Sequence, residues 1–287
     1  MWKAAVAAAR KEGVDIVADS ARSIAGGSIN DAWRVNSDIG PLFVKFNDSA
    51  MHEMFAAEAA GLQELAQTNS IRVPRVICSG CDNSWSFLIL EYIAFDRSDN
   101  EAGRLLGLQL AQLHGCHSEA FGWFRDNTIG STPQINTQTD DWIEFFGQHR
   151  LGFQLELASR RGGARLAKSG AQLCEQLDRF FAGITIEPAL LHGDLWGGNW
   201  GVCKGQPVIF DPAVYYGDSE TDIAMTTLFG GFPQSFYTTY REELPDKPGG
   251  RQRRELYRLY HVLNHYNLFG GGYGAQAERM IGALLAD

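Results

Sequence analysis

The chain has 287 residues, which is above the usual size of one domain, so we expect two lobes around a large hydrophobic core. Hydrophobic residues make up 45% and charged residues 21%, which excludes a disordered chain. The formal net charge of −9 argues against nucleic acid as a partner, because affinity for a phosphate backbone requires clustered Lys and Arg. The one short basic cluster, Arg251, Arg253 and Arg254, is interpreted as the solvated start of a helix.

Neither a membrane segment nor a disulfide framework is indicated. No apolar stretch of the sequence approaches the roughly 20 residues that cross a bilayer, and residues 1–11 predict an amphipathic helix. We therefore expect a cytoplasmic protein without membrane contact. Five cysteines do not resemble a disulfide framework. Cys78 and Cys81 lack the second pair that a zinc site needs, so we interpret them as free thiols in a loop between strands.

The first predicted β structure contains a turn of small residues. Residues 24–35 indicate a strand, a turn and a returning strand, with Gly26, Gly27 and Ser28 in the turn. Glycines at such a place let backbone N–H groups approach a phosphate closely. Taken alone, the pattern fits an ordinary β-turn better, so its meaning depends on the rest of the chain.

A lysine within an apolar strand follows. Residues 41–46 predict a strand in which Lys45 lies among apolar side chains, where an ammonium group is costly without a partner. Residues 53–65 have helical spacing and place Glu58 thirteen residues after Lys45. We predict an ion pair between these two side chains. The alternative is a surface lysine and a surface glutamate on an amphipathic helix.

Two further elements complete the first half of the chain. Residues 86–93 predict an apolar strand that runs into a short polar connection. Residues 101–117 predict a helix with leucines at core spacing, and its His114 is interpreted as a packed core histidine rather than a ligand.

The most informative stretch is the His-Gly-Asp motif that ends at Asp194 and follows the apolar run 189–191. Asn199 comes five positions after Asp194, and a second apolar run, 208–210, leads to Asp211. Each residue alone fits an ordinary turn, but phosphoryl transfer requires this combination. A carboxylate deprotonates the acceptor hydroxyl, while an Asn and an Asp hold magnesium on the phosphates. The sequence therefore predicts an ATP-dependent phosphotransferase with Asp194 as catalytic base and Asn199 and Asp211 as Mg²⁺ ligands.

A phosphotransferase centre assigns roles to the earlier elements. Lys45, held by Glu58, is expected to position the α- and β-phosphates of ATP. We predict an N-lobe over residues 1–91 and a C-lobe over residues 92–287. The connection between them is expected to bind adenine through the backbone of Glu91, Tyr92 and Ile93.

Several short motifs carry a resemblance to a known family. They are residues 26–30, 43–45, 140–142, 149–151, 191–196, 211–213, 216–220, 229–233 and 263–267. Together they resemble the fructosamine kinase (ketosamine-3-kinase) family, over nearly the whole chain. The His-Gly-Asp motif is shared with aminoglycoside phosphotransferases and choline kinases, whereas the Leu-Trp after Asp194 is more specific. One departure bears on the acceptor, because the family usually has Ser where this chain has Gly198.

The resemblance implies an α+β, protein-kinase-like fold with a small, mainly β N-lobe and a larger helical C-lobe. It also implies phosphorylation of sugar O3 in a small-molecule or protein-bound ketoamine, a deglycation repair reaction. Trp196 follows two residues after Asp194 and is expected to stack on the sugar, the alternative being a core aromatic. His265 is a second candidate for substrate binding. Asp222 is expected to cap a helix or brace the catalytic loop.

Two other functions stay open at this point. The first is a kinase for another acceptor, such as an aminoglycoside, choline or another amino alcohol. The second is a non-catalytic nucleotide-binding protein, which is disfavoured because Lys45, Asp194, Asn199 and Asp211 are all present. The sequence leaves the number of subunits open.

Overall fold

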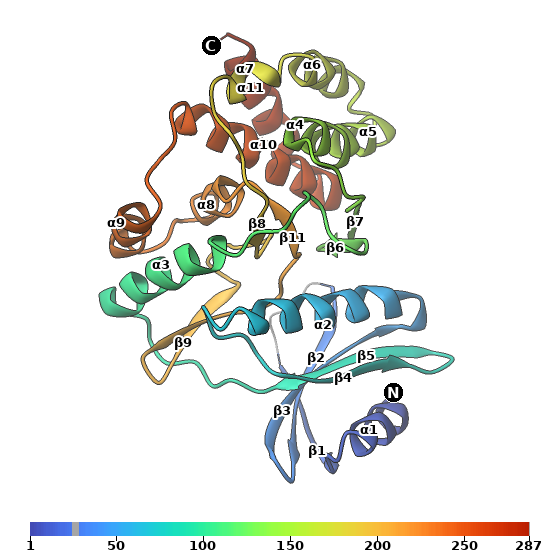
Figure 1. Cartoon of the computed structure of the whole chain (residues 1–287). Helices are drawn as coiled ribbons and strands as arrows, with labels where there is room; N and C mark the ends of the chain where they lie inside the picture. Colours follow the sequence, from blue (N-terminus) through green and yellow to red (C-terminus); the bar gives the residue numbers. More distant parts are fainter. Residues whose placement is uncertain (25–28, 287) are drawn as a thin grey trace.

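The computed structural model describes residues 1–24 and 29–286, and the described chain forms two lobes (Figure 1). The smaller lobe contains a five-stranded antiparallel sheet in the order β1-β2-β3-β5-β4. Gly26, Gly27 and Ser28 of the predicted turn lie outside the described residues. The strands of this sheet are β1 Ile16–Ile24, β2 Asp31–Ser37, β3 Gly40–Asp48, β4 Val76–Cys81 and β5 Trp85–Glu91.

One helix covers each face of this sheet. Helix α1 (Trp2–Lys11) lies on one side and α2 (His52–Gln67) on the other, as Figure 1 shows. Val44 and Phe46 of β3 belong to the same buried cluster as the alanines of α1. Because side chains alternate along a strand, Lys45 between them faces α2. The alternation thus brings the buried lysine to the helix that carries its predicted partner.

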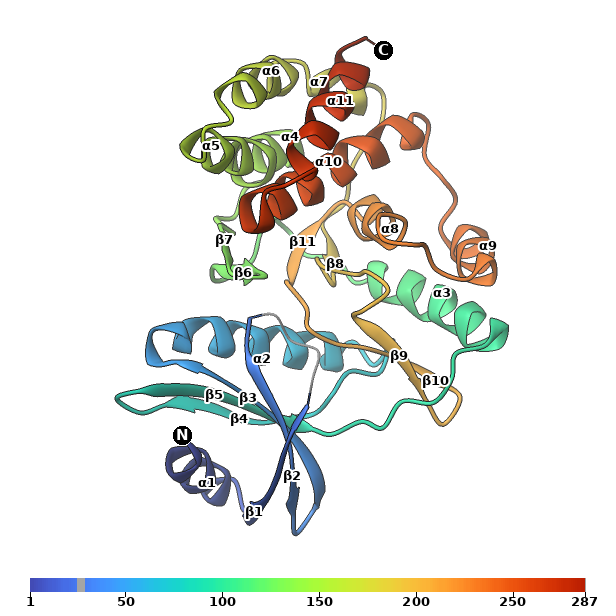
Figure 2. The same ribbon diagram turned by 180° about the vertical axis from the view of Figure 1, so that it is seen from behind.

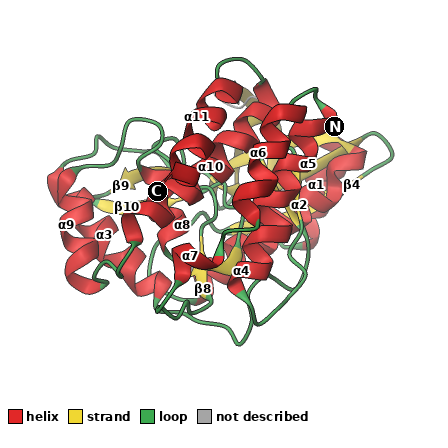
Figure 3. Cartoon of the chain, turned by 90° about the horizontal axis from the view of Figure 1, so that it is seen from above, coloured by secondary structure: helices red, strands yellow, loops and turns green. Residues whose placement is uncertain are grey.

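The larger lobe is mostly helical (Figure 3). Its longest helix, α10, has half of its 20 residues buried and contacts α5, α8 and α11. No helix within the described residues is both long and apolar enough to span a bilayer. The other elements are η1 Ser49–Met51 in the smaller lobe and, in the larger, α3 Asn100–His114, β6 Asn127–Ile129, β7 Thr132–Gln134, α4 Trp142–Phe145, the π-helix η2 Phe146–Gly152, α5 Phe153–Arg160, α6 Ala164–Cys174, α7 Asp178–Phe181, β8 Ala189–Leu191, β9 Trp200–Cys203, β10 Gln206–Ile209, β11 Tyr215–Gly217, α8 Glu220–Thr226, α9 Gln234–Glu243, α10 Gly250–Phe269 and α11 Tyr273–Ala286.

The β9–β10 hairpin lies beside the connection between the lobes (Figure 2). Val208 of β10 forms an isolated backbone β-bridge with Arg72 of the smaller lobe, and Val202 of β9 forms another with Asp96 of the connection. The N–H of Ile209 donates to the carbonyl of Arg72 over 3.0 Å. Since β10 leads directly to Asp211, contacts with the smaller lobe and the connection fix where Asp211 enters the region between the lobes.

Two boundaries differ from the sequence predictions. The helix predicted over residues 101–117 ends at His114, because the N–H of Gly115 caps it with hydrogen bonds to carbonyls of the last turn. Cys78 and Cys81 are free thiols as expected, but they lie within strand β4 rather than in a loop. Strand β4 is an edge strand paired only with β5 among the described strands, and small residues are tolerated there.

The interpretation of Arg253 as part of a solvated helix start is wrong. Its side chain is completely buried, and its guanidinium donates to both carboxylate oxygens of Glu220 over 3.0 and 2.9 Å. A paired Arg matches a carboxylate with two parallel bonds, which compensates for the loss of water. Arg253 therefore joins α10 to α8 inside the larger lobe.

Candidate active site

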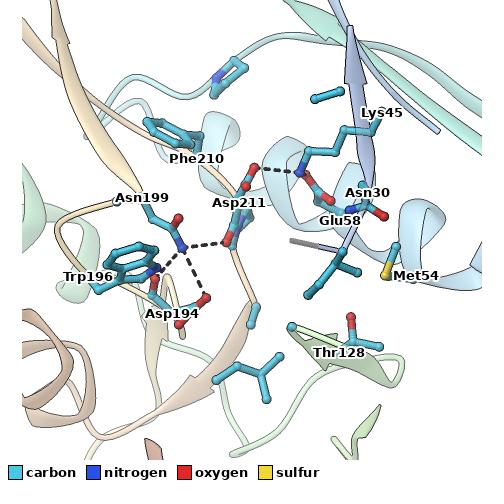
Figure 4. A pocket seen from close by; sticks show the side chains of 18 of the residues that line it. Asn30, Lys45, Met54, Glu58, Thr128, Asp194, Trp196, Asn199, Phe210 and Asp211 are labelled. Atoms are coloured by element: carbon cyan, nitrogen blue, oxygen red, sulfur yellow. Dashed lines mark hydrogen bonds and ion pairs between the residues drawn. The ribbon is translucent and has the colours of Figure 1, made fainter. Parts of the chain in front are cut away.

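A cavity of about 650 Å³ lies between the two lobes. The smaller lobe contributes strands β1 to β3, helix α2 and the end of β5. The larger lobe contributes the β6–β7 hairpin, the end of α10 and the loop of residues 192–199 between β8 and β9, which we call the catalytic loop. Figure 4 shows the polar centre of this cavity, where Lys45, Asp194, Asn199 and Asp211 face one another. The structure therefore brings together the four residues that the sequence predicts for phosphoryl transfer.

The predicted ion pair of Lys45 is present and is shared between the lobes. Its Nζ donates to Glu58 Oε1 and to Asp211 Oδ1, each over 2.7 Å (Figure 4). Burial alone lowers the pKa of Lys45, but the two carboxylates outweigh it and hold the pKa above its usual value. The ammonium group is thus permanently charged and fixed between α2 and the segment after β10.

Helix α8 braces the loop that carries Asp194. The carboxylate of Asp222 accepts from the N–H groups of His192 and Gly193 over 2.7 and 2.8 Å, and lies 3.2 Å from Nε2 of His114. Gly193 has φ of +82°, and a Cβ there would lie 2.0 Å from a backbone carbonyl, so only glycine fits. The interpretation of Asp222 as a brace is confirmed, and the packed core histidine His114 contacts it.

Asp194 lies at the polar centre with an altered acidity. Its desolvation, reinforced by the nearby charge of Asp211, raises the pKa of Asp194 to about 7, although a hydrogen bond from Asn199 opposes the shift. Nδ2 of Asn199 donates to Asp194 Oδ2 over 3.2 Å and to the Asp194 carbonyl over 2.9 Å. A general base is most effective when its pKa lies close to the working pH, so this environment suits proton abstraction.

The pKa of Asp194 predicts a pH limb in the kinetics. Only the ionised carboxylate accepts a proton, and its pKa of about 7 lies above the usual value for Asp. We therefore expect kcat/KM for the acceptor to fall about tenfold per pH unit below the pKa of this carboxyl and to level off above it. The measurement is a pH profile of kcat/KM at saturating MgATP, where the positive charge of bound Mg²⁺ would lower the pKa of Asp194 from its value in the free protein. A profile with no loss of rate on the acid side would contradict the assignment.

Asn199 and Asp211 offer oxygen ligands to a metal ion. Nδ2 of Asn199 is used by Asp194, which leaves its amide oxygen for other partners, and Asp211 has one carboxylate oxygen beyond the Lys45 bond. Asp211 adopts φ of +56°, a left-handed conformation that is uncommon among residues other than glycine and is found at functional sites. Within the described residues no group of three or more His, Cys, Asp or Glu side chains is arranged to hold a metal ion by itself. Such a sparse oxygen set fits Mg²⁺, which takes its remaining ligands from phosphates and water.

The connection between the lobes differs in detail from the predicted adenine site. Glu91, Tyr92 and Ile93 all line the cavity, but the N–H of Glu91 donates to a backbone carbonyl of Arg75. The N–H of Tyr92 likewise donates to the carbonyl of Pro41. Within the described residues the N–H of Ile93 makes no hydrogen bond. Of the three backbone N–H groups, that of Ile93 is therefore the one available to a purine base.

Two aromatic residues at this end of the cavity were not found from the sequence. The rings of Phe95 and Phe210 stack with centroids 5.1 Å apart, and both line the cavity. Flat apolar rings of this kind suit a planar base. Phe210 directly precedes Asp211 in an apolar run, which was a usable signal, whereas nothing in the sequence marks Phe95.

The other end of the cavity carries the two predicted substrate residues. The indole of Trp196 is 38% exposed and meets the ring of Phe229 edge-on, with centroids 6.1 Å apart, so it is not a core aromatic. The ring of Phe229 in turn lies 4.6 Å from that of His265. Nδ1 of His265 donates to the carbonyl of His261 over 2.9 Å, which leaves Nε2 as an acceptor. Desolvation lowers the pKa of His265, so this ring is neutral.

Helix α2 is also tied directly to the larger lobe. Glu64 accepts from the indole N–H of Trp123 over 2.5 Å and from the hydroxyl of Tyr216 over 2.7 Å. Tyr216 belongs to β11, which pairs with β8 just before the catalytic loop. Glu58 lies less than two turns earlier on the same helix, so Glu64 holds the helix that carries the partner of Lys45.

We expect Glu64→Ala to raise the ATP KM several-fold, because α2 loses both bonds to the larger lobe and Lys45 is held less firmly. Glu64→Gln is the matched control, since an amide still accepts from Trp123 and donates to Tyr216. Steady-state kinetics with ATP varied separate the two variants. An unchanged ATP KM in Glu64→Ala would show that α2 is held by packing alone.

The cavity and the lobes define a phosphotransferase fold of the protein-kinase-like class. An aminoglycoside phosphotransferase crystallised with AMP-PNP and hygromycin B is similar over 95% of this chain and 94% of that chain, with a TM-score of 0.65 at 14% identity. Identity that low shows the fold alone. The predicted α+β, two-lobed class is confirmed.

The chain belongs to the fructosamine kinase family, whose family model matches residues 1–287. A "Probable ketoamine kinase" of Synechocystis is 48% identical over 262 residues, covering 91% of this chain and 88% of the relative. The chloroplastic protein-ribulosamine 3-kinase of Arabidopsis thaliana is 46% identical over 264 residues, with 90% and 80% covered. A crystal structure assigned to a fructosamine-3-kinase of Haemophilus somnus has a TM-score of 0.91 at 30% identity, covering 99% of this chain and 98% of that chain.

Proposed function

We propose that this protein is an ATP- and Mg²⁺-dependent kinase that phosphorylates O3 of the sugar in a ketoamine, a fructosamine or a ribulosamine. The observation that carries the proposal is the convergence of Lys45, Asp194, Asn199 and Asp211 in one cavity between the lobes. A protein that only binds nucleotide has no need for a carboxylate with a raised pKa in the cavity that also contains Lys45.

The residues divide the chemistry between them. Lys45, oriented by Glu58, would hold the phosphates, and Asn199 and Asp211 would hold Mg²⁺, which would supply positive charge to the phosphates. Asp194 would accept the proton of the acceptor hydroxyl while the hydroxyl oxygen forms a bond to the γ-phosphorus of ATP. The bond between that phosphorus and the oxygen bridging to the β-phosphate breaks, and ADP leaves with its electron pair. The N–H of Ile93 and the stacked rings of Phe95 and Phe210 would hold the adenine of the nucleotide. Positioning and charge stabilisation then supply most of the rate enhancement.

The acceptor class follows from the relatives and from the substrate end of the cavity. The relatives are named ketoamine kinase and ribulosamine 3-kinase, which supports a sugar attached to an amine. The Trp196 indole offers a flat apolar face beside Asp194, and Nε2 of His265 offers an acceptor for a hydroxyl or an ammonium group. A free or protein-bound ketoamine fits both features, and removal of such adducts is a repair reaction.

An aminoglycoside is a poorer fit for this cavity. A polycation needs carboxylates that are free to pair with it. Four acids line the cavity within the described residues, and each already has a task. Glu58 and Asp211 bind Lys45, Glu91 binds Arg72 over 2.7 Å, and Asp194 is the base.

We also propose the functional division into an N-lobe of residues 1–91 and a C-lobe of residues 92–287, with the protein acting in the cytoplasm. Strand β5 ends at Glu91, which supports the boundary. On the sequence alone, we propose that Gly26, Gly27 and Ser28 bind the phosphates of ATP through their backbone N–H groups.

An acceptor screen tests the proposed function. Purified protein is incubated with MgATP and fructosyl-lysine, ribulosyl-lysine, an aminoglycoside or choline, and ADP release and phosphorylated product are measured. We expect turnover with at least one ketoamine and phosphate on O3 of its sugar. Turnover only with the aminoglycoside or choline would leave a kinase with another substrate, and no turnover with any acceptor would contradict the proposal.

Asp211→Asn tests the metal assignment. The amide binds Mg²⁺ more weakly than the carboxylate, so we expect the Mg²⁺ concentration for half-maximal rate to rise at least tenfold. The variant should keep its fold, because Asn retains an acceptor for Lys45 and tolerates the left-handed backbone at this position. The measurement is a magnesium titration at fixed ATP, and a curve that superimposes on the parent would remove Asp211 from the metal site.

A further inference from the structure

The indole of Trp196 lies directly over the backbone of Gly198. A Cβ atom at position 198 would be 2.3 Å from Cη2 of the indole, 2.4 Å from Cζ2 and 2.8 Å from Cζ3. Carbon atoms in contact lie about 3.5–4.0 Å apart, so any side chain at 198 would overlap the ring. The observed position of the indole therefore requires glycine at 198.

The backbone around Gly198 is held at both ends, so the ring is the part that would move. The N–H of Asn199 donates to the carbonyl of Trp196 over 2.9 Å, and the N–H of Trp196 donates to the carbonyl of Asp194 over 3.2 Å. The side chain of Asn199 adds a second bond to the Asp194 carbonyl. A Cβ at 198 would therefore displace the indole and leave the catalytic loop in place.

The displaced ring matters because of where it lies. Trp196 and Gly198 both line the cavity, and Figure 4 shows the indole beside Asp194 and Asn199. The ring is partly exposed and meets Phe229 only edge-on, so it has room to swing. A shift of the ring by more than 1 Å, the overlap to be relieved, changes the surface that an acceptor meets next to the base.

We infer that Gly198 is a specificity-determining residue, which sets the position of the Trp196 indole and through it the fit of the acceptor. The inference rests on the proposed function in one respect, namely that the acceptor binds on the Trp196 side of Asp194. Gly198 needs no contact with the acceptor itself. Its role is to lack a side chain where the indole lies.

Gly197 supplies a matched control for a Gly198→Ala variant. A Cβ at Gly197 meets no atom within 4 Å, and neither glycine is among those with a left-handed backbone. Both substitutions reduce the freedom of the unfolded chain equally, so they differ only in the contact with the indole. We expect Gly198→Ala to lower kcat/KM for the ketoamine roughly tenfold, as loss of a stacked ring would. The ATP KM should stay within about twofold of the parent, and Gly197→Ala should match the parent in both.

A double variant separates the indole from the backbone. Trp196→Ala should lower kcat/KM for the ketoamine about as much as Gly198→Ala, and Trp196→Ala/Gly198→Ala should be no worse than Trp196→Ala alone. An additional loss in the double variant would overturn the inference, because the effect of Gly198 would then pass through the backbone. Parent-like kinetics of Gly198→Ala would overturn it as well.

A spectroscopic measurement separates this inference from the proposed function. Acrylamide quenching of tryptophan fluorescence reports exposure of the indole without any acceptor. Gly198→Ala should change the quenching, Gly197→Ala should not, and the change should vanish when Trp196 is replaced by Phe. Failure of ketoamine turnover in the parent would contradict the proposed function alone, and the kinetic comparison would move to whichever acceptor is turned over. Unchanged quenching in Gly198→Ala would contradict the role of Gly198 whatever the acceptor.

Discussion

Asp194→Asn should bind MgATP as the parent does and lose turnover by about 10²–10⁴-fold, the usual contribution of a general base. The amide cannot accept the acceptor's proton, but its oxygen still accepts the hydrogen bond from Asn199. The bonds from His192 and Gly193 to Asp222 also remain, so the loop keeps its shape. Calorimetric titration with ATP and single-turnover kinetics measure the two effects separately.

Asp140→Asn is the control for that experiment, because Asp140 is exposed and does not line the cavity. It should match the parent in both measurements. Turnover of Asp194→Asn within tenfold of the parent would remove Asp194 from the role of base. A large loss of ATP affinity would instead indicate that the carboxylate organises the nucleotide site.

The parts of the site that sequence reasoning found are those encoded by local patterns. Because side chains alternate along a strand, Lys45 lies on the other face of the sheet from Val44 and Phe46. Helical spacing places Glu58 on the side of α2 that faces Lys45. Asp194 and Asn199 lie in one short loop, so their spacing alone constrains their separation. Asp211 follows a strand of its own, and the apolar run before it marks where that strand ends.

The parts that sequence reasoning missed depend on contacts between distant segments. Glu64 reads as a polar residue on a helix surface, and only the packing of α2 on the larger lobe brings it to Trp123 and Tyr216. Arg253 reads as one of three exposed cations, yet the fold buries it against Glu220. A sequence pattern gives the face of an element, whereas the identity of its neighbour depends on the whole fold.

The contact of Trp196 with Gly198 is a third case of this limit. The sequence indicates a large ring near the base and a glycine two residues later. It does not indicate that the ring turns back over that glycine, because the turn and the side-chain rotamer together decide the direction.

Lys45→Met should raise the ATP KM and lower kcat, each about tenfold or more, because the cation that positions the phosphates is lost. The variant should remain folded but be less stable by about 3 kcal/mol, the usual cost of removing one partner from a buried ion pair. Burial raises the pKa of Glu58, and Lys45 is the group that opposes this shift. Without Lys45 the folded protein therefore favours protonated Glu58 more strongly than the unfolded chain does.

The sign of the pH dependence follows from that shift. A carboxyl group whose pKa is raised in the folded state loses its contribution to stability as the pH rises through that raised pKa. The pKa of Glu58 is already raised in the parent and is raised further without Lys45, so the stability deficit of Lys45→Met should grow as the pH rises above the folded-state pKa of Glu58 in the parent. Replacing Glu58 by Gln in the same chain removes the titrating group. Lys45→Met/Glu58→Gln should therefore regain stability at pH 8 while its ATP kinetics stay as poor as those of Lys45→Met. Urea denaturation at pH 5 and pH 8 gives the stabilities. Recovery of the ATP KM in the double variant would mean that Lys45 serves the fold and another cation holds the phosphates.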